Sequence, residues 1–223
     1  MKIGLIADVH ANISALQAVI NDMPSVDLWI CAGDVVGYYS DINEVCSLLR
    51  QLGAWVIRGN HDAYVTEGLM PRPDRRSMYR TDWTRENLDP AHLAWLATLP
   101  VEMAFHLGEK FIRVRHANPW DEETYLYHDS AQLNKISLDC NEVLVLGHTH
   151  HPMLVRCGKG IVINPGSVGQ PRDWNPLASY AVLSTDSGEV DFRRVSYDVA
   201  RLQQKLTKLR WDSATISILN RIH

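Results

Sequence analysis

Gly59-Asn60-His61-Asp62 directly follows the apolar run Ala54–Arg58, and this order of strand-forming residues, glycine and polar side chains decides the fold. Similar apolar runs recur along the chain, and each predicts a β-strand. They are Lys2–Ala7, Asp27–Ala32, Ala54–Arg58, Lys110–Arg115 and Glu142–Leu146. Between the first three runs, Asn12–Asp22 and Asp41–Leu52 predict amphipathic helices with Asn12 and Asp41 as N-caps. Short helical connections between apolar strands are typical of an α/β fold with a largely parallel sheet.

The rest of the chain departs from this alternation. Residues 63–100 are too many for a simple connection and predict a helical insertion lying over the sheet, with pieces near Arg75–Leu88 and Pro90–Leu99. After residue 100, hairpins are predicted at residues 103–115, 153–163 and 179–195, followed by an amphipathic helix over Val199–Leu209. No linker or charge block divides the chain. We therefore expect one domain, residues 1–223, with the insertion at about 63–100.

Composition excludes several classes of protein. The chain has 223 residues, a formal net charge of -4 and 46% hydrophobic residues. No apolar run approaches the ~20 residues of a membrane helix, and the first residues lack the features of a signal peptide. We therefore expect no membrane partner and a cytoplasmic location. The net charge also argues against long nucleic acid as a partner, because such binding depends on cationic side chains.

Polar side chains follow all five apolar runs. Because ligands bind at the carboxyl ends of strands in α/β sheets, we expect them to meet at one sheet edge. They are Asp8, His10, Asp34, Asn60, His61, Asp62, His116, His148 and His150. In an extended segment, residues two apart point to the same side, so Asp8 with His10 and His148 with His150 are each expected to grip an ion. Two carboxylates, one amide oxygen and four imidazoles exceed one tetrahedral site. They suit two divalent ions that share a carboxylate, and Mn, Fe, Zn or Co rather than Ca.

Asp8-x-His10, Gly33-Asp34, Gly59-Asn60-His61-Asp62, His116 and Gly147-His148-x-His150 together resemble the calcineurin-like metallophosphoesterases, in that family's order. The resemblance extends to about residue 195, and residues 164–172 resemble the small bacterial single-domain branch. It implies a two-sheet α/β/β/α sandwich. It also implies that Asp34 bridges two metal ions. The first ion would be held by Asp8, His10, Asp34 and His150, and the second by Asp34, Asn60, His116 and His148.

The same resemblance implies a hydrolase. Its substrate would be a small phosphomonoester or phosphodiester, with a nucleotide as one candidate. A hydroxide shared by two divalent ions, of which Mn is favoured, is a nucleophile near neutral pH and would attack phosphorus in line. His61 would protonate the leaving group as general acid, with Asp62 orienting it. The chain departs from the family pattern at Tyr39-Ser40, Ala117-Asn118 and Trp174, which affects the substrate pocket and not the ligands.

Candidate substrate contacts each have a structural alternative. Arg58 and Arg172 are expected either to clamp phosphate or to form surface salt bridges. Trp120 and Trp174 are expected either to rim the site, where they would stack on a base or aryl group, or to pack against the insertion. The insertion's arginines predict either steering of an anionic substrate or a solvated helix face. They are Arg72, Arg75, Arg76, Arg80 and Arg85.

Two further alternatives concern the whole molecule. A protein of this fold can be a catalytically silent metal-binding interaction scaffold. The complete set of ligand positions, together with His61, favours the enzyme. The apolar tail predicts either packing against its own sheet or a homodimer seam, and its residues are Ile216, Ile218, Leu219 and Ile222.

Overall fold

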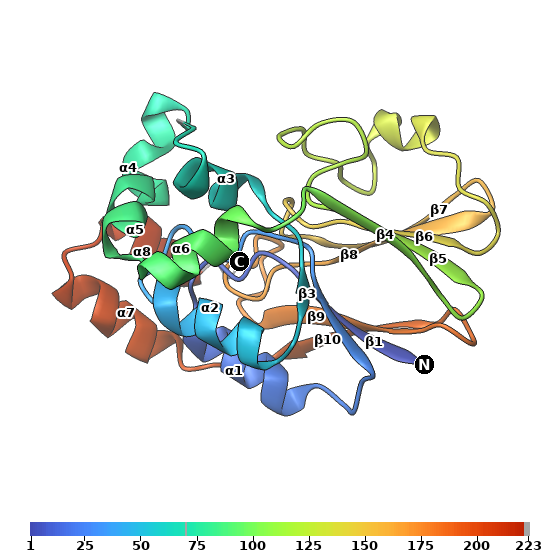
Figure 1. Ribbon diagram of the computed structural model, residues 1–223. Helices are drawn as coiled ribbons and strands as arrows, with labels where there is room; N and C mark the ends of the chain where they lie inside the picture. The colour runs from blue at the N-terminus through green and yellow to red at the C-terminus, as the bar shows by residue number, and fades with distance from the viewer. Residues whose placement is uncertain (70, 221–223) are drawn as a thin grey trace.

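Two mixed five-stranded sheets form the centre of the protein (Figure 1). The computed structural model describes residues 1–69 and 71–220. The first sheet has the order β10-β9-β1-β2-β3 and the second the order β4-β5-β6-β8-β7. Apolar side chains of both sheets form one buried cluster, which includes Leu5, Ile30, Ile112, Val145 and Ala181. The two sheets therefore pack face to face through a shared core.

The first sheet joins strands from both ends of the chain. β1, β2 and β3 are parallel, whereas β9 runs antiparallel to β1 and β10 antiparallel to β9. The strands are β1 (Lys2–Ile6), β2 (Leu28–Cys31), β3 (Trp55–Val56), β9 (Ala178–Ser184) and β10 (Val190–Val195). β3 is shorter than the predicted strand at 54–58, and only two of its residues pair with β2.

The second sheet is built from two hairpins around β6. β4 pairs antiparallel with β5, and β7 with β8, as the sequence predicts, whereas β5, β6 and β8 are parallel. The strands are β4 (Glu102–Leu107), β5 (Lys110–Arg115), β6 (Glu142–Val145), β7 (Pro152–Cys157) and β8 (Gly160–Pro165). The 3-10 helix η2 (Ala131–Lys135) covers the outer face, where Leu133 packs with Leu144 and Val162. The expected two-sheet α/β sandwich is confirmed.

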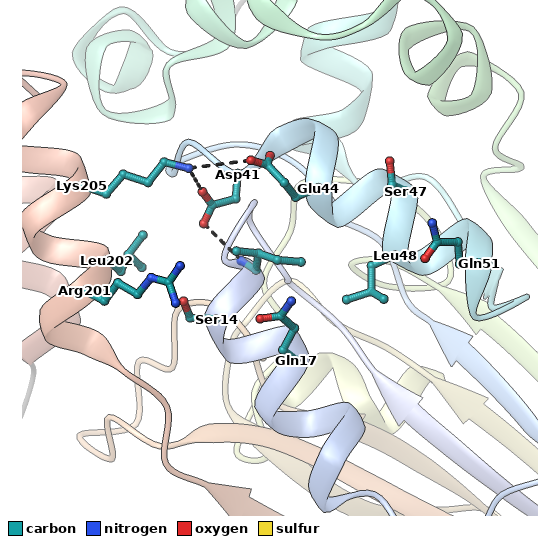
Figure 2. Close-up of a pocket in the computed structure, with 11 residues that line it drawn as sticks. Ser14, Gln17, Asp41, Glu44, Ser47, Leu48, Gln51, Arg201, Leu202 and Lys205 are labelled. Atoms are coloured by element: carbon teal, nitrogen blue, oxygen red, sulfur yellow. Dashed lines mark hydrogen bonds and ion pairs between the residues drawn. The ribbon is translucent and has the colours of Figure 1, made fainter.

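Three helices cover the outer face of the first sheet: α1 (Ile13–Asp22), α2 (Ile42–Gln51) and α7 (Val199–Lys208). Asn12 caps α1 as predicted, because its side chain accepts the N–H of Ala15 at 3.1 Å. Asp41 was predicted to cap α2 but makes no such hydrogen bond. Its carboxylate accepts the N–H of Ile13 at 3.4 Å and pairs with Lys205, which ties the three helices together around a surface groove (Figure 2).

The insertion is broken into short helices: α3 (Asn60–Thr66), η1 (Pro73–Arg75), α4 (Arg76–Tyr79), α5 (Thr81–Asn87) and α6 (Pro90–Ala97). The helix predicted over residues 75–88 is interrupted at Arg80, whose φ of 56° is left-handed. The insertion does not simply lie over the sheet. Instead, α6 contacts α2, and Trp83 packs edge-on against Trp211 with ring centroids 4.7 Å apart. The insertion therefore extends the layer of helices formed by α1, α2 and α7.

The chain after α7 returns to this helical layer. α8 (Ser213–Ser217) and η3 (Ile218–Asn220) follow, with Ile216 packed against the helical core and Leu219 buried. Ile222, the last residue of the predicted apolar tail, lies outside the described residues. None of the described helices is long and apolar enough to cross a membrane.

One topological expectation is wrong. The five polar strand ends do not share one sheet: β1, β2 and β3 belong to the first, and β5 and β6 to the second. Hydrophobic patterns mark strands but do not identify their partners.

Candidate functional site

The loops that follow β1, β2, β5 and β6 meet where the two sheets lie together. The Asp8 N–H donates to the Gly33 carbonyl and the His10 N–H to the Asp34 carbonyl, both at 3.0 Å. From the second sheet, the His148 N–H donates to the Asp8 carboxylate at 3.0–3.1 Å. These backbone bonds join the polar strand ends of both sheets into one buried centre.

Five of the seven candidate metal ligands have left-handed backbone conformations, which non-glycine residues seldom adopt. Their φ angles are 53° at Asp8, 48° at His10, 55° at Asp34, 67° at His148 and 61° at His150. The expected extended geometry of the pairs is therefore wrong, and His148 and His150 fall into different groups of side chains. Such strained backbone costs of order 1–3 kcal/mol per residue and clusters at functional sites.

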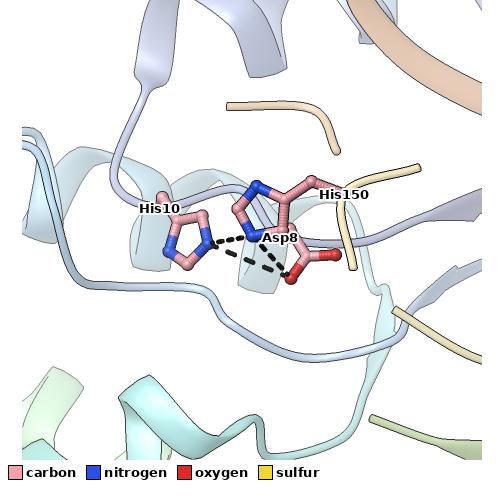
Figure 3. Close-up of side chains that lie close together, drawn as sticks. All are labelled: Asp8, His10 and His150. Atoms are coloured by element: carbon pink, nitrogen blue, oxygen red, sulfur yellow. Dashed lines mark hydrogen bonds and ion pairs between the residues drawn. The ribbon is translucent and has the colours of Figure 1, made fainter. Parts of the chain in front are cut away.

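Three overlapping groups of side chains come close enough to hold a cation. They are Asp8, His10 and His150 (Figure 3); His10, Asp34 and His61; and Asp34, His116 and His148. Asp34 lies between the outer groups, because its Oδ2 is 3.6 Å from His10 Nε2 and 3.3 Å from His116 Nε2. Asn60 adjoins the third group, with its Oδ1 3.1 Å from both His116 Nε2 and His148 Nδ1. The structure thus brings together all seven candidate metal ligands.

The hydrogen bonds of the four histidines fit a metal centre. In each ring one nitrogen faces a backbone carbonyl oxygen, to which only a ring N–H can donate. These contacts are His10 Nδ1 with Val36 at 3.1 Å, His116 Nδ1 with Ala32 at 2.7 Å, His148 Nε2 with Glu123 at 3.0 Å and His150 Nδ1 with Gln170 at 2.5 Å. When a ring is neutral, as a metal-bound imidazole is, its other nitrogen carries a lone pair directed inward. Such outer hydrogen bonds fix the tautomer of metal-bound histidines.

The neighbours of these inward-facing nitrogens also fit a metal centre. His10 Nε2 and His150 Nε2 are 3.0 Å apart, and the inner nitrogens of His116 and His148 face the carbonyl oxygen of Asn60. Lone pairs therefore converge on lone pairs and carboxylates in a buried space. A cation resolves this convergence, and mixed imidazole, carboxylate and amide donors suit Mn, Fe, Zn or Co.

The buried carboxylates compete for positive charge. Burial raises the pKa of Asp8 to about 8. Burial acts in the same direction on Asp34, but its electrostatic interactions with the neighbouring His116 and His61 imidazoles outweigh burial and hold its pKa well below the usual range. At His116 burial lowers the pKa, yet the Asp34 carboxylate dominates and raises it to about 10. The centre is therefore short of positive charge, which bound cations would supply.

His61 lies beside this centre on the first turn of α3. Its backbone N–H donates to Asp34 Oδ1 at 2.9 Å, and its ring lies 4.8 Å from Tyr38 and 4.3 Å from Tyr79, centroid to centroid. Burial lowers the pKa of His61 to about 4. The free site therefore holds this imidazole neutral at pH 7.

Asp62 does not contact the His61 ring as expected. Its carboxylate accepts the backbone N–H groups of Gly59 at 2.9 Å, Val36 at 3.1 Å and Val35 at 3.3 Å. Within residues 1–69 and 71–220, no hydrogen bond joins it to the imidazole. Asp62 thus holds the loops after β2 and β3 together, and any influence on His61 acts through the backbone.

Arg172 borders a cavity of about 460 Å³ beside the His–Asp centre. Its Nη2 donates to the Tyr38 hydroxyl at 2.8 Å and to Gln170 Oε1 at 2.9 Å. No carboxylate among the described residues forms an ion pair with it. The guanidinium therefore retains charge for an anion in the cavity.

The other predicted substrate contacts do not line the Arg172 cavity. Arg58 pairs with Glu67 and with Glu122 at 3.2 Å, which is the salt-bridge alternative. Trp120 and Arg58 line a second cavity, which also borders the centre because the candidate ligand Asn60 lines it. Trp174 is 55% exposed and is not among the residues that line the cavity beside Arg172. Whether either tryptophan contacts a substrate stays a prediction.

Four tyrosines line the Arg172 cavity and were not predicted: Tyr38, Tyr64, Tyr79 and Tyr125. Tyr125 stacks on His148, with centroids 4.2 Å apart. Two of them carry a local signal, since Tyr38 follows Gly37 in the loop after β2, and Tyr64 lies one helical turn after His61. Tyr79 and Tyr125 come from distant segments and carry none.

A two-sheet sandwich with a buried His–Asp centre at its strand ends is an arrangement that suits a metallophosphoesterase. The chain belongs to the calcineurin-like phosphoesterase superfamily, whose domain matches residues 1–188, and is therefore a phosphoester hydrolase. The family implies divalent metal ions. The crystal structure of a metallophosphoesterase from Sphaerobacter thermophilus is 30% identical, with a TM-score of 0.84 over 99% of this chain and 98% of that one.

Two curated proteins add to this comparison. Uncharacterized protein MJ0912 of Methanocaldococcus jannaschii is 30% identical over 93% of each chain. Phosphodiesterase YfcE of Escherichia coli is 47% identical over 53 residues, which are 24% of this chain and 28% of that protein.

Proposed function

We propose that this hydrolase cleaves a small phosphoester with the help of two divalent metal ions. The observation that supports this most strongly is the convergence of four inward-facing imidazole nitrogens on two buried carboxylates and one amide oxygen. The first ion would be held by Asp8, His10, Asp34 and His150, and the second by Asp34, Asn60, His116 and His148. Mn²⁺ is the favoured ion, and the cytoplasmic location remains a prediction.

When bound, divalent ions lower the pKa of coordinated water and offset charge on phosphoryl oxygens. The chain's own groups act beside them. Arg172, without a carboxylate partner among the described residues, would bind a phosphoryl oxygen through charge-assisted hydrogen bonds. Asp34 positions the backbone of His61 through the hydrogen bond to its N–H.

His61 would donate a proton to the leaving oxygen. The imidazole is neutral in the free site, because burial lowers its pKa to about 4. A phosphate group in the cavity adds negative charge nearby, which favours the protonated ring. Substrate binding would therefore load the acid that the reaction needs. The partial match to a phosphodiesterase supports diesters as well as monoesters among the substrates.

Hydrolysis of p-nitrophenyl phosphate and bis-p-nitrophenyl phosphate tests the proposal. Turnover is expected with Mn²⁺, and EDTA is expected to abolish it. His61→Ala should lower kcat by about 100-fold or more, which is the usual contribution of a general acid. His128→Ala is the matched control, since His128 is exposed and lines a different cavity.

Metal-independent turnover, or turnover unchanged in His61→Ala, would contradict this assignment. Metal binding without any turnover would instead support the interaction scaffold. The ratio of the two substrates would distinguish a monoesterase from a diesterase. Sedimentation of the same protein would decide whether it forms a homodimer, which the sequence leaves open as one of two alternatives for the apolar tail.

A further inference from the structure

The cavity beside the His–Asp centre is larger than a phosphate group requires. Its volume of about 460 Å³ falls in the range of sites that enclose drug-sized ligands, about 300–1,000 Å³. One wall comes from the loops around Tyr38 and Arg172, and another from Arg72, Arg75 and Tyr79 of the insertion. The insertion therefore contributes directly to the space in which a substrate would lie.

The charge of this cavity favours an anion. Three arginines line it, Arg72, Arg75 and Arg172, against one carboxylate, Glu123. Glu123 accepts the Tyr64 hydroxyl at 2.5 Å, and burial raises its pKa. Arg72 and Arg75 share a single carboxylate, Asp74, at 3.3 and 3.4 Å. Two guanidinium groups on one carboxylate leave a net positive charge on the insertion's wall.

The same cavity offers aromatic surfaces. Tyr79 stacks parallel to Tyr64, with centroids 6.1 Å apart and an interplanar angle of 11°. Tyr125 is 40% exposed and stacks on His148. Tyrosine faces with arginines nearby are the combination that binds the bases and phosphates of nucleotides.

We propose that Arg72 and Arg75 form a second anion subsite that recognises a phosphate beyond the scissile one, in a substrate whose remaining part carries an aromatic ring system. A nucleoside di- or triphosphate has this chemistry. The inference rests on the proposed function, because the His–Asp centre and Arg172 are taken as the position of the scissile phosphate. The insertion thereby acts as the specificity element of the enzyme.

Isothermal titration of the Mn²⁺-loaded, full-length protein with α,β-methylene-ADP tests the subsite without depending on turnover. Arg72→Gln and Arg75→Gln are each expected to weaken Kd by about three- to tenfold, and the double variant by more. Arg76→Gln is the matched control, because Arg76 belongs to the same insertion but pairs with Asp82 at 2.8 Å and does not line the cavity. Its Kd should stay within about twofold of the parent.

A second comparison separates the contribution of the phosphates to binding from that of the aromatic ring system. Methylenediphosphonate, which lacks the nucleoside, should bind about tenfold or more weakly than the nucleotide analogue, because stacking contributes per base. In the Arg72 and Arg75 variants, turnover of p-nitrophenyl phosphate, which lacks a second phosphate, should fall by a smaller factor than the affinity for the nucleotide analogue does. Added salt should weaken analogue binding more in the parent than in the double variant.

The outcomes distinguish the two proposals. Analogue binding by Arg72→Gln and Arg75→Gln that equals that of Arg76→Gln would overturn the subsite. Equal losses in analogue binding and in p-nitrophenyl phosphate turnover would mean that the two arginines bind the scissile phosphate. This outcome would also overturn the second subsite. Equal affinities for methylenediphosphonate and the nucleotide analogue would refute the aromatic part. Absence of p-nitrophenyl phosphate turnover in the parent would count against the proposed function, and the titration would still decide on the subsite.

Discussion

Gly37 sits against the proposed general acid. It has a φ of 94°, and a Cβ added there would meet the His61 ring at Nδ1 and at Cγ. We predict that Gly37→Ala displaces the imidazole and lowers kcat for p-nitrophenyl phosphate by about tenfold or more, with metal stoichiometry retained.

Gly53→Ala controls for the backbone strain. Gly53 also has a positive φ, 65°, but a Cβ there has nothing within 4 Å. Both variants should lose thermal stability through the strained backbone, with a larger loss in Gly37→Ala because of the clash, and only Gly37→Ala should lose activity. Equal kcat values in the two variants would show that the close approach to His61 has no catalytic consequence.

Asp121 provides a pH-dependent test in the loop after β5. Burial works to raise its pKa, but the N–H groups of Thr124 and Glu123 and the Asn118 amide outweigh burial and lower it to about 2. Because the folded-state pKa lies below the unfolded value, the carboxylate stabilises the fold above about pH 4, and this contribution is lost as the pH falls towards 2. The Tm of metal-free protein should exceed that of Asp121→Asn at pH 7, and the difference should shrink below pH 4. A Tm difference independent of pH would contradict the assignment.

At the residue scale, the candidate metal ligands could be predicted because each follows an apolar run directly. Asp34 and Asn60 come after a glycine that ends such a run, so the local sequence marks them. Tyr79 lies on an insertion whose course depends on packing against distant segments, so its place beside the centre could not be predicted from local patterns. Arg72 of the same insertion was a candidate for steering an anionic substrate, but the sequence could not separate this role from a solvated helix face.

At the scale of elements, the segment after α7 supports the site through one hydrogen bond. The buried Trp211 donates its Nε1–H to the Tyr38 carbonyl at 2.6 Å, and the Tyr38 N–H donates to Tyr79. Tyr38 has a φ of 61°, so its peptide needs these outside partners. Trp211 thus connects the segment after α7 to the loop after β2, in which the Tyr38 ring packs against His61.

We predict that Trp211→Phe destabilises the protein by roughly 1–3 kcal/mol, because the buried Tyr38 carbonyl loses its donor. A lower kcat should accompany this loss, since the Tyr38 ring packs against both His10 and His61. Urea unfolding and p-nitrophenyl phosphate turnover measure the two effects. Trp55→Phe, at a 45% exposed position on β3, should change neither. Unaltered stability in Trp211→Phe would show that the hydrogen bond contributes little.

Elements were predicted well where the pattern is local. The hairpins and α1 follow from alternation, glycine turns and the Asn12 cap, all of which lie within a few residues. The break at Arg80 has no local signal. Its left-handed backbone is accompanied by tertiary contacts, since the guanidinium lies 4.2 Å from the centroid of the Trp211 ring and donates to the Arg210 carbonyl.

For the whole molecule, the centre connects two sheets that also share a buried apolar core. The resemblance to a known family predicted this two-sheet arrangement, whereas strand patterns alone predicted a single edge. The reason is physical: β5 and β6 have the same apolar character as β1 and β2, and nothing in a strand's own residues specifies its neighbour.

Metal removal should therefore lower the stability of the entire fold. Ions that bind only the folded state stabilise it by mass action, by about 2.7 kcal/mol at 100 times Kd for one site. For a chain of this length that corresponds to a Tm difference of roughly 5–10 °C. Calorimetry with Mn²⁺ and after EDTA treatment measures it, and Asp34→Asn should show a much smaller difference. A Tm indifferent to chelation would mean that the His–Asp centre holds no ion under those conditions.

The place of β1 in the middle of the first sheet has a consequence for the protein's synthesis. Ile3 pairs with Leu28 on one side but with Leu183 on the other. On the ribosome the first partner follows almost at once, whereas the second waits for about 150 more residues, roughly 8–30 s at 5–20 residues per second. Throughout that interval the nascent chain carries an unpaired apolar edge, a template for pairing with neighbouring chains. Slower translation between residues 32 and 178 lengthens that exposure and with it the risk of aggregation before the chain is complete.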